Sequence, residues 1–183
     1  MILLVDLCYK KDSLSGYEFV HPIANILKRI EAPHGIVHYT GLHGDLLESA
    51  EKIILCGTAL KDNAYCEQIG QFSWLKSYEK PVLGICAGMQ IIGLAFGGEI
   101  VSQPTIGLEK IEIIRETPLL GEPRQIEGYH LHNFGVTMPD GFDLVAGVQQ
   151  RAEAFSHCQR SIYGIIFHPE VRNRWIVERF ANL

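Results

Sequence analysis

The sequence has no apolar run long enough to cross a lipid bilayer. Its first residues, MILLVDLCYKKDS, lack the basic start and the small-residue cleavage site of a secretory signal. Basic residues are not in excess either, because 21 Asp and Glu outnumber 16 Lys and Arg and give a formal net charge of -5. A nucleic-acid partner requires a basic face that neutralises phosphates. These absences predict a cytoplasmic protein that binds neither membranes nor nucleic acids.

Paired cysteines are also absent. The five cysteines are an odd number and none has CxxC spacing, so the sequence predicts neither a disulfide framework nor a metal site. Cys8 and Cys56 lie in or beside apolar segments and are expected to be small buried hydrophobes. Cys66 and Cys158 carry no signal. Cys86 differs from the other four because of its neighbours.

What the chain does contain is enough apolar content for one core. Hydrophobic residues make up 47% and charged residues 20% of the 183 positions, as is typical of a globular domain. No repeat, low-complexity segment or linker divides the sequence. We therefore expect a single domain over residues 1–183.

The first half of the chain alternates short apolar runs with helical patterns. Continuous apolar runs predict buried strands at residues 1–6, 35–39, 52–57 and 81–86. Helical spacing predicts helices at residues 19–31 and 87–98. Such an alternation predicts an α/β fold with an open, mostly parallel central sheet of the flavodoxin-like type and helices on both faces.

The second half has shorter strand patterns, which predict a small additional antiparallel sheet. They lie at residues 110–114, 126–132, 143–149, 153–157 and 162–168. An amphipathic stretch at residues 172–183 then predicts a C-terminal helix.

Residues 84–88 read GICAG and place Cys86 between two glycines, where an apolar run meets a helical pattern. This is the form of a nucleophile elbow, a sharp turn that holds the nucleophile in a strained backbone conformation and in which a β-carbon at either glycine would clash. The turn places Cys86 at a helix N-terminus, which favours thiolate over thiol, and it aims the N–H of Ala87 at an oxyanion. Taken alone, the pattern fits a tight strand–helix junction equally well.

A second motif lies near the end of the chain, where the run IYGIIFHPEV contains His168, Pro169 and Glu170. Residues i and i+2 of an extended chain point to the same side, and Pro169 favours an extended His168. Glu170 is therefore expected to orient the imidazole of His168. A thiol, a histidine and an orienting carboxylate are the parts of a nucleophilic triad, so Cys86, His168 and Glu170 are the candidate catalytic residues.

Together, PVLGICAGMQIIGLAFGGEI and IYGIIFHPEV resemble a class I, triad-type glutamine amidotransferase domain, and the resemblance covers nearly the whole chain. It implies that Cys86 attacks the side-chain amide of L-glutamine and that His168 acts as general base and then as acid. It further implies an oxyanion hole formed by the backbone N–H groups of Gly57 and Ala87, and no cofactor. From the residues alone, a plain turn after a strand remains the alternative for Gly57.

The same resemblance implies a substrate site. Gln90 matches a position that helps to hold the glutamine. The segment GYHLHNFGV resembles the one that presents backbone groups to the amino acid end of glutamine, here at His132, Asn133 and Phe134. Thr58 departs from the pattern, because many relatives have a second glycine there. Residues 8–20 match no subgroup, and a surface loop is the favoured interpretation.

The segments FGGEIV, MPDGFDLVA and YGIIFHPEV most resemble the amidotransferase subunit of GMP synthase, and the anthranilate and aminodeoxychorismate type comes next. This likeness implies a glutaminase subunit that delivers ammonia to a separate synthetase, such as the ATP-pyrophosphatase subunit of GMP synthase. Two alternatives stay open: a γ-glutamyl hydrolase or peptidase with the same triad, and a catalytically silent regulatory subunit.

Overall fold

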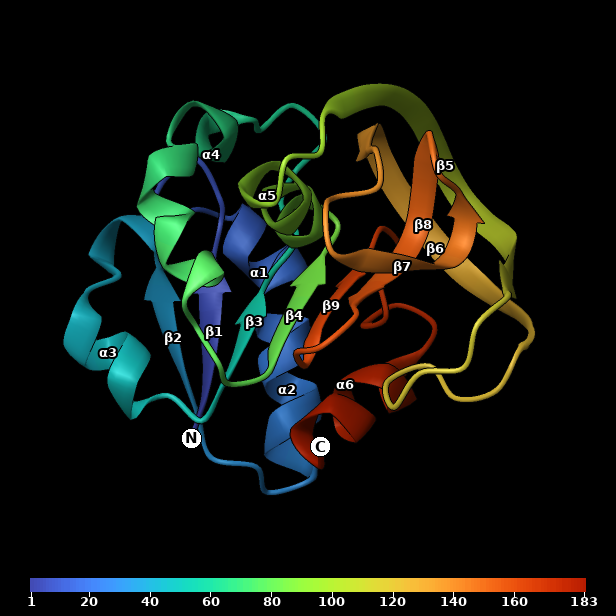
Figure 1. Ribbon diagram of the computed structural model, residues 1–183. Coiled ribbons are helices and arrows are strands. Elements are labelled where there is room, and N and C mark those ends of the chain that lie inside the picture. The colour runs from blue at the N-terminus through green and yellow to red at the C-terminus, as the bar shows by residue number, and fades with distance from the viewer.

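One nine-stranded sheet runs through the computed structural model, which describes residues 1–183 (Figure 1). Its strand order is β2-β1-β3-β4-β9-β8-β7-β5-β6. The parallel strands are β1 (Ile2–Asp6), β2 (His34–His38), β3 (Lys52–Leu55), β4 (Val82–Ile85) and β9 (Ile162–Ile165). The antiparallel strands are β5 (Ile100–Ile113), β6 (Arg124–Val136), β7 (Phe142–Val148) and β8 (Arg151–His157).

The predicted α/β class is confirmed, but the separate antiparallel sheet is not. Strand β8 pairs with β9 from Ala154 opposite Ile165 to Ser156 opposite Tyr163, so the antiparallel strands continue the parallel sheet. The physical reason is that β9 would otherwise end the sheet with a row of unpaired backbone groups beside the core. The sequence pattern showed each strand but not which strand would pair with this edge.

Helices pack against the parallel strands in two groups, with the sheet between them. The first group is α1 (Ser15–Phe19), α2 (His21–Arg29) and the C-terminal α6 (Arg174–Ala181), with α2 in contact with both others. The second is α3 (Gly44–Ser49), α4 (Ala64–Glu67), the 3₁₀ helix η2 (Ile69–Lys76) and α5 (Ala87–Ala95), which packs on η2. A short 3₁₀ turn, η1 (Tyr39–Gly41), follows β2.

Burial follows the sequence pattern in the parallel strands. Every residue of β1, β4 and β9 is buried, as continuous apolar runs require of strands covered on both faces. Strand β2 lies at the edge of the sheet and is only partly buried. The core thus sits on both faces of the parallel strands, and it fixes the carboxyl ends of β3 and β4, from which the candidate catalytic loops emerge.

Two expectations about local structure need correction. Residues 8–20 were expected to form a surface loop, but Ser15–Phe19 form α1, and the helix expected at 19–31 is α2 alone. Strand β5 begins ten residues before the expected 110–114 segment. Its early part was hidden because Pro104 lies at a register irregularity and Gly107 has a positive φ of 115°, and both residues read as turn signals in the sequence.

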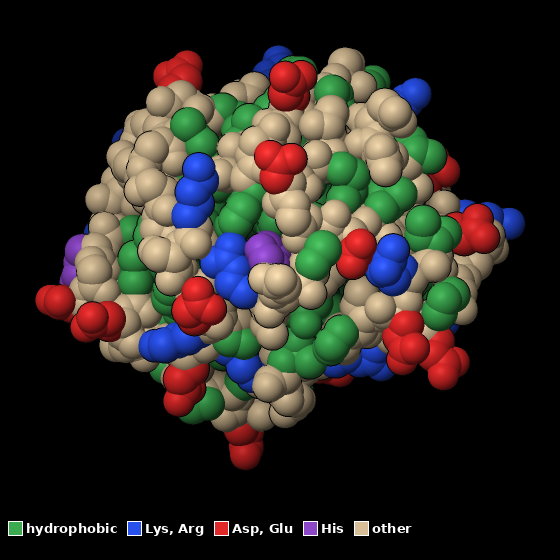
Figure 2. All heavy atoms as spheres, viewed as in Figure 1, with side chains coloured by type: hydrophobic (Ala, Val, Ile, Leu, Met, Phe, Trp, Pro, Cys, Tyr) green, Lys and Arg blue, Asp and Glu red, His purple; other side chains and the backbone are tan.

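Figure 2 shows the surface on the side viewed in Figure 1, where acidic and basic side chains are interspersed and do not gather into a patch of one sign. Among the helices, none combines the length and the apolar character that crossing a membrane would require.

Candidate active site

The elbow expected at residues 84–88 is present. Cys86 lies between β4 and α5 with φ 50° and ψ -102°, a conformation that costs a residue with a β-carbon roughly 1–3 kcal/mol. A β-carbon on Gly84 would lie 2.5 Å from the carbonyl of Gly88, and one on Gly88 would lie 2.2 Å from the carbonyl oxygen of Leu55. The two glycines are therefore required by the close approach of β4, α5 and β3. The turn leaves Cys86 as the N-cap of α5.

His168 and Glu170 form the expected pair, since Nδ1 of His168 lies 2.8 Å from Oε1 of Glu170 and both side chains are buried. The argument from an extended chain was wrong, however, because β9 ends at Ile165 and residues 169–171 form a turn. The N–H of His168 donates to the carbonyl of Tyr129 on β6, which fixes the backbone before the turn. The imidazole and carboxylate thus meet across a turn that strand β6 holds in place.

The charge state of His168 follows from its neighbours. Burial by itself would lower the pKa of His168, but Cys86 and the Glu170 carboxylate outweigh burial and raise that pKa to about 10. The imidazolium is therefore the favoured form at neutral pH. Nε2 of His168 is buried and makes no hydrogen bond within the protein, so the proton that it carries can pass to a substrate atom.

The two candidate oxyanion donors follow β3 and Cys86 in the chain. Gly57 follows β3 and abuts His168 so closely that a β-carbon would lie 2.8 Å from Cε1 of the imidazole. The N–H of Gly57 donates to no protein acceptor, which leaves it available to a ligand. Ala87 is the first residue of α5 and is buried directly after Cys86. The close contact with His168 explains the glycine better than a plain turn does.

A small cavity lies beside Cys86, with a volume of about 20 Å³, about the space of one water molecule. Its lining includes every residue expected to bind substrate: Gln90, His132, Asn133 and Phe134. The loop of residues 58–63 supplies the opposite wall. The residues expected to bind substrate thus line one cavity, whose walls must separate before a side chain as large as that of glutamine could enter.

Gln90 is already engaged at both ends of its amide. Oε1 accepts a 2.6 Å hydrogen bond from the hydroxyl of Tyr65, and Nε2 donates a 2.7 Å bond to the carbonyl of Phe134. Each end keeps one further hydrogen-bonding position for a ligand. Asn133 donates to the carbonyl of Leu60 at 3.1 Å, which ties β6 to the loop after β3. No sequence signal pointed to Tyr65 or to this tie.

His132 makes a contact that the sequence did not suggest. Its Nε2 lies 3.0 Å from Nδ1 of His130, and both imidazoles are buried beneath the cavity. Burial lowers the pKa of each histidine to about 4, and the positive charge of His168 acts in the same direction on His130. Both imidazoles are therefore neutral near pH 7, and the side chain of His132 is engaged with His130.

A comparison with family models matches residues 15–176 to the class-I glutamine amidotransferase domain. The chain belongs to the class-I glutamine amidotransferase family. The matched range includes both ends of the candidate triad, and the resemblance inferred from GICAGMQ and FHPEV is confirmed. This amidotransferase is thus a member of an enzyme family, as expected.

Similar proteins point to one subgroup. The amidotransferase is 32% identical over 181 residues to a glutamine-hydrolysing GMP synthase subunit of Pyrococcus furiosus, covering 93% of this chain and 89% of that protein. It is 33% identical over 169 residues to the protein of the same name from Methanococcus maripaludis, covering 86% of this chain and 85% of that protein. A crystal structure of a GMP synthase subunit protein from Thermoplasma acidophilum superposes with a TM-score of 0.84 at 27% identity, covering 99% of this chain and 92% of the other.

The other four cysteines of the amidotransferase lack the setting of Cys86. Burial raises the pKa of Cys8 to about 12 and that of Cys56 well above its ordinary value. The pKa values of Cys66 and Cys158 are raised as well. Cys8 and Cys56 are buried, as predicted. Among the five thiols, Cys86 is the one that acts on the pKa of His168, through its charge.

Proposed function

We propose that this amidotransferase hydrolyses the side-chain amide of L-glutamine through a thioester on Cys86 and delivers the ammonia to a separate synthetase. The observation that carries the proposal is the buried His168–Glu170 pair, 2.8 Å between Nδ1 and Oε1, whose imidazole faces the strained cysteine of the elbow. No cofactor is needed, because a thiol, a general base and two backbone donors suffice for acyl transfer.

In the first half-reaction, Sγ of Cys86, having given its proton to Nε2 of His168, attacks the amide carbon of glutamine. The N–H groups of Gly57 and Ala87 stabilise the negative charge that develops on the carbonyl oxygen. His168 then protonates the leaving nitrogen, which departs as ammonia and leaves a glutamyl thioester. Glu170 accepts the hydrogen bond from Nδ1 and holds the ring in the orientation that both proton transfers need.

In the second half-reaction, His168 takes a proton from water, which attacks the thioester carbon. Collapse of the tetrahedral intermediate breaks the C–S bond, returns the thiolate and releases glutamate. Gln90, with one free position at each end of its amide, holds the side chain of the bound glutamine. The backbone of His132, Asn133 and Phe134 holds its amino acid end.

The receiving subunit is the ATP-pyrophosphatase subunit of a GMP synthase. Support comes from the relatives in Pyrococcus furiosus and Methanococcus maripaludis, which are both named as glutamine-hydrolysing GMP synthase subunits and are both covered over at least 85% of their length. The cavity of about 20 Å³ is too small for glutamine, so we expect low activity of the chain alone and stimulation by the synthetase subunit.

Glutamate release from L-glutamine tests the proposal, measured for the chain alone and with the synthetase subunit. The wild type should turn over, Cys86→Ala should lose at least about 10³-fold in kcat, and the control Cys158→Ala, which removes an exposed thiol, should match the wild type. If neither the wild type nor Cys86→Ala released glutamate in any mixture, glutaminase activity would be refuted.

The γ-glutamyl hydrolase alternative requires a site open to a large leaving group, and the small cavity does not favour it. Turnover of a γ-glutamyl peptide with free glutamine ignored would support that alternative instead. The alternative of a silent regulatory protein requires a broken triad, whereas Cys86, His168 and Glu170 are all in place.

A further inference from the structure

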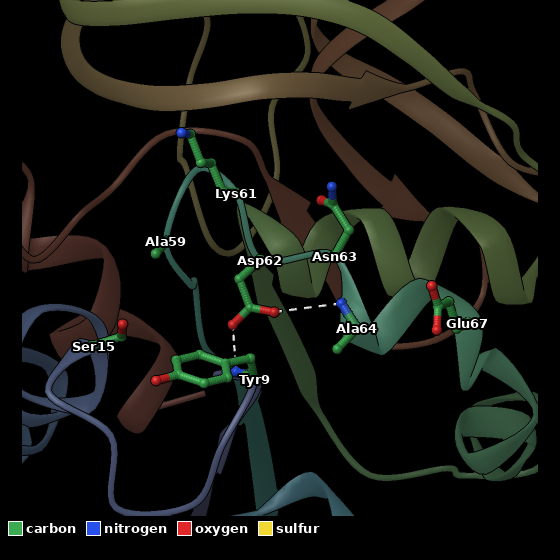
Figure 3. Close-up of a pocket in the computed structure, with 8 residues that line it drawn as sticks. All are labelled: Tyr9, Ser15, Ala59, Lys61, Asp62, Asn63, Ala64 and Glu67. Carbon is green, nitrogen blue, oxygen red and sulfur yellow. Dashed lines mark hydrogen bonds between the residues drawn. The ribbon is translucent and has the colours of Figure 1, made fainter.

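The loop that follows β3, residues 57–63, separates two cavities. One is the small cavity beside Cys86, and the other is a cavity of about 530 Å³ lined by Tyr9, Ser15, Lys61 and Glu67, among others (Figure 3). The larger cavity lies at the carboxyl ends of β1 and β3. Strand β2 lies on one side of β1 and β3 on the other, so the strand order reverses direction between β1 and β3. Asp62 lines both cavities.

Asp62 is a buried carboxylate, 8% exposed, and it forms no ion pair. Its charge is met by hydrogen-bond donors from two loops and a helix. Oδ2 accepts a 2.8 Å bond from the hydroxyl of Thr58 and another from the N–H of Tyr9, and Oδ1 accepts a 3.4 Å bond from the N–H of Ala64. Figure 3 shows the bonds to Tyr9 and Ala64 converging on this one side chain. A buried charge without a counter-ion is costly unless such donors satisfy it, so the arrangement ties the donors together.

These contacts reach the oxyanion loop directly. Thr58 is the residue after Gly57, and its side chain is held by Asp62 on the β1 side of the loop. On the other side, Asn133 of β6 holds the carbonyl of Leu60. Gly57 is thereby kept against His168 with its N–H unused by the protein. The hydroxyl of Thr58 supplies an anchor that the second glycine expected from the resemblance would lack.

We propose that Asp62 is a positioning residue for glutamine hydrolysis: through Thr58 it sets the oxyanion donor Gly57, and through Tyr9 it couples that donor to the segment of residues 8–20. The inference rests on the proposed function, since it concerns the same reaction. Asp62 acts through Thr58 and Tyr9, whose hydroxyl and N–H donate hydrogen bonds to its carboxylate. Its role is to fix the loop so that the Gly57 N–H is in place when charge develops on the substrate oxygen.

The test compares Asp62→Ala, Asp62→Asn and Thr58→Val with a control, Glu67→Ala, which removes a carboxylate from the wall of the same larger cavity and breaks no hydrogen bond of the protein. Two rates are measured on the enzyme with its synthetase subunit: kcat and KM for glutamate release, and the alkylation of Cys86 by iodoacetamide. Alkylation displaces iodide at a saturated carbon and builds no oxyanion, so it reports the thiolate and His168 but not the oxyanion hole.

Loss of a whole oxyanion donor costs about 10²–10³-fold in kcat, so a loosened donor in Asp62→Ala and Thr58→Val should cost about 10–100-fold. KM and the alkylation rate should stay within about threefold of the wild type, because neither depends on the oxyanion. Asp62→Asn should recover most of kcat, since an amide oxygen at the Oδ2 position still accepts from Thr58 and Tyr9. Unchanged kcat in Asp62→Ala, or an equal fall in kcat and alkylation, would overturn the inference.

Hydrogen exchange provides a readout that needs no turnover. In Asp62→Ala, the amides of residues 57–63 and of residues 8–20 should exchange faster together, while those of β7 should not change. If the wild type proves inactive with every synthetase, the proposed function fails and exchange alone decides the coupling. Unchanged exchange in either segment would then refute it.

Discussion

The buried pair His130–His132 should make the enzyme unusually sensitive to mild acid. Nδ1 of His130 and Nε2 of His132 are 3.0 Å apart, so one proton must lie between two otherwise neutral rings. Protonating both would face two donors toward each other beside the positive charge of His168. In the folded state both pKa values are lowered to about 4, against 6.5 for an ordinary histidine.

The sign follows from proton linkage. A base whose pKa is lower in the folded state binds protons mainly when the chain is unfolded. Its contribution to the free energy of unfolding is therefore complete above pH 6.5, falls as the pH drops toward 4, and is constant below that pH. Between pH 8 and pH 5 the free energy of unfolding falls by about 2 kcal/mol for one such histidine and by about 4 kcal/mol for the pair. That is a large part of the 5–15 kcal/mol typical of a domain.

Two other histidines need to be considered in the same range. His168 has the opposite sign, because its pKa is raised to about 10: its contribution to the free energy of unfolding is complete below pH 6.5 and is lost as the pH rises through 10. From pH 8 to 5 it adds about 2 kcal/mol, most of it above pH 6.5, in the wild type and in a variant without the pair alike, so the difference between the two proteins reports the pair. His157 has a pKa lowered by burial and adds to the acid sensitivity, but it is partly exposed and contributes less.

The assay is urea unfolding at pH 8, 7, 6 and 5 at constant ionic strength. The double variant His130→Phe/His132→Phe removes both partners of the hydrogen bond together and should lose less than half as much stability between pH 8 and 5 as the wild type. The control His21→Gln removes an exposed histidine and should follow the wild type. Equal losses in the wild type and the double variant would show that the pair does not titrate as its burial requires.

Other expected outcomes concern the elbow and the triad. Iodoacetamide should label Cys86 before the other four cysteines, whose thiol pKa values are all raised; mass-mapped labelling of Cys158 first would contradict this. Glu170→Gln should lower the pKa of His168, which ¹⁵N NMR titration would show. Glu170→Ala should keep a kcat at least about tenfold higher than that of Cys86→Ala. Equal losses of kcat in the two variants would give Glu170 a larger role. Gly88→Ala should destabilise the fold by about 3 kcal/mol or more in urea, because its β-carbon would lie 2.2 Å from a backbone oxygen, whereas Gly70→Ala, with open space around it, should not.

Local chemistry in the sequence was enough to find the elbow, the His168–Glu170 pair and the parallel strands. Two glycines around Cys86 have few explanations other than a close backbone approach, and the 2.2 and 2.5 Å contacts bear this out. Continuous apolar runs require burial on both faces, and β1, β4 and β9 are fully buried. These features depend on residues near one another in the chain, and for that reason they can be recognised from sequence patterns.

What the sequence left undecided depends on which distant segments meet. The pairing of β8 with β9, the contact between His130 and His132, and the hydrogen bonds from Tyr9 and Thr58 to Asp62 join groups whose residue types carry no local signal. Hydrogen bonds of buried polar groups are satisfied by whatever the packing brings within about 3 Å. Amino-acid order alone therefore determined the strained turn at Cys86, while only the folded arrangement decided which groups anchor the loop beside it.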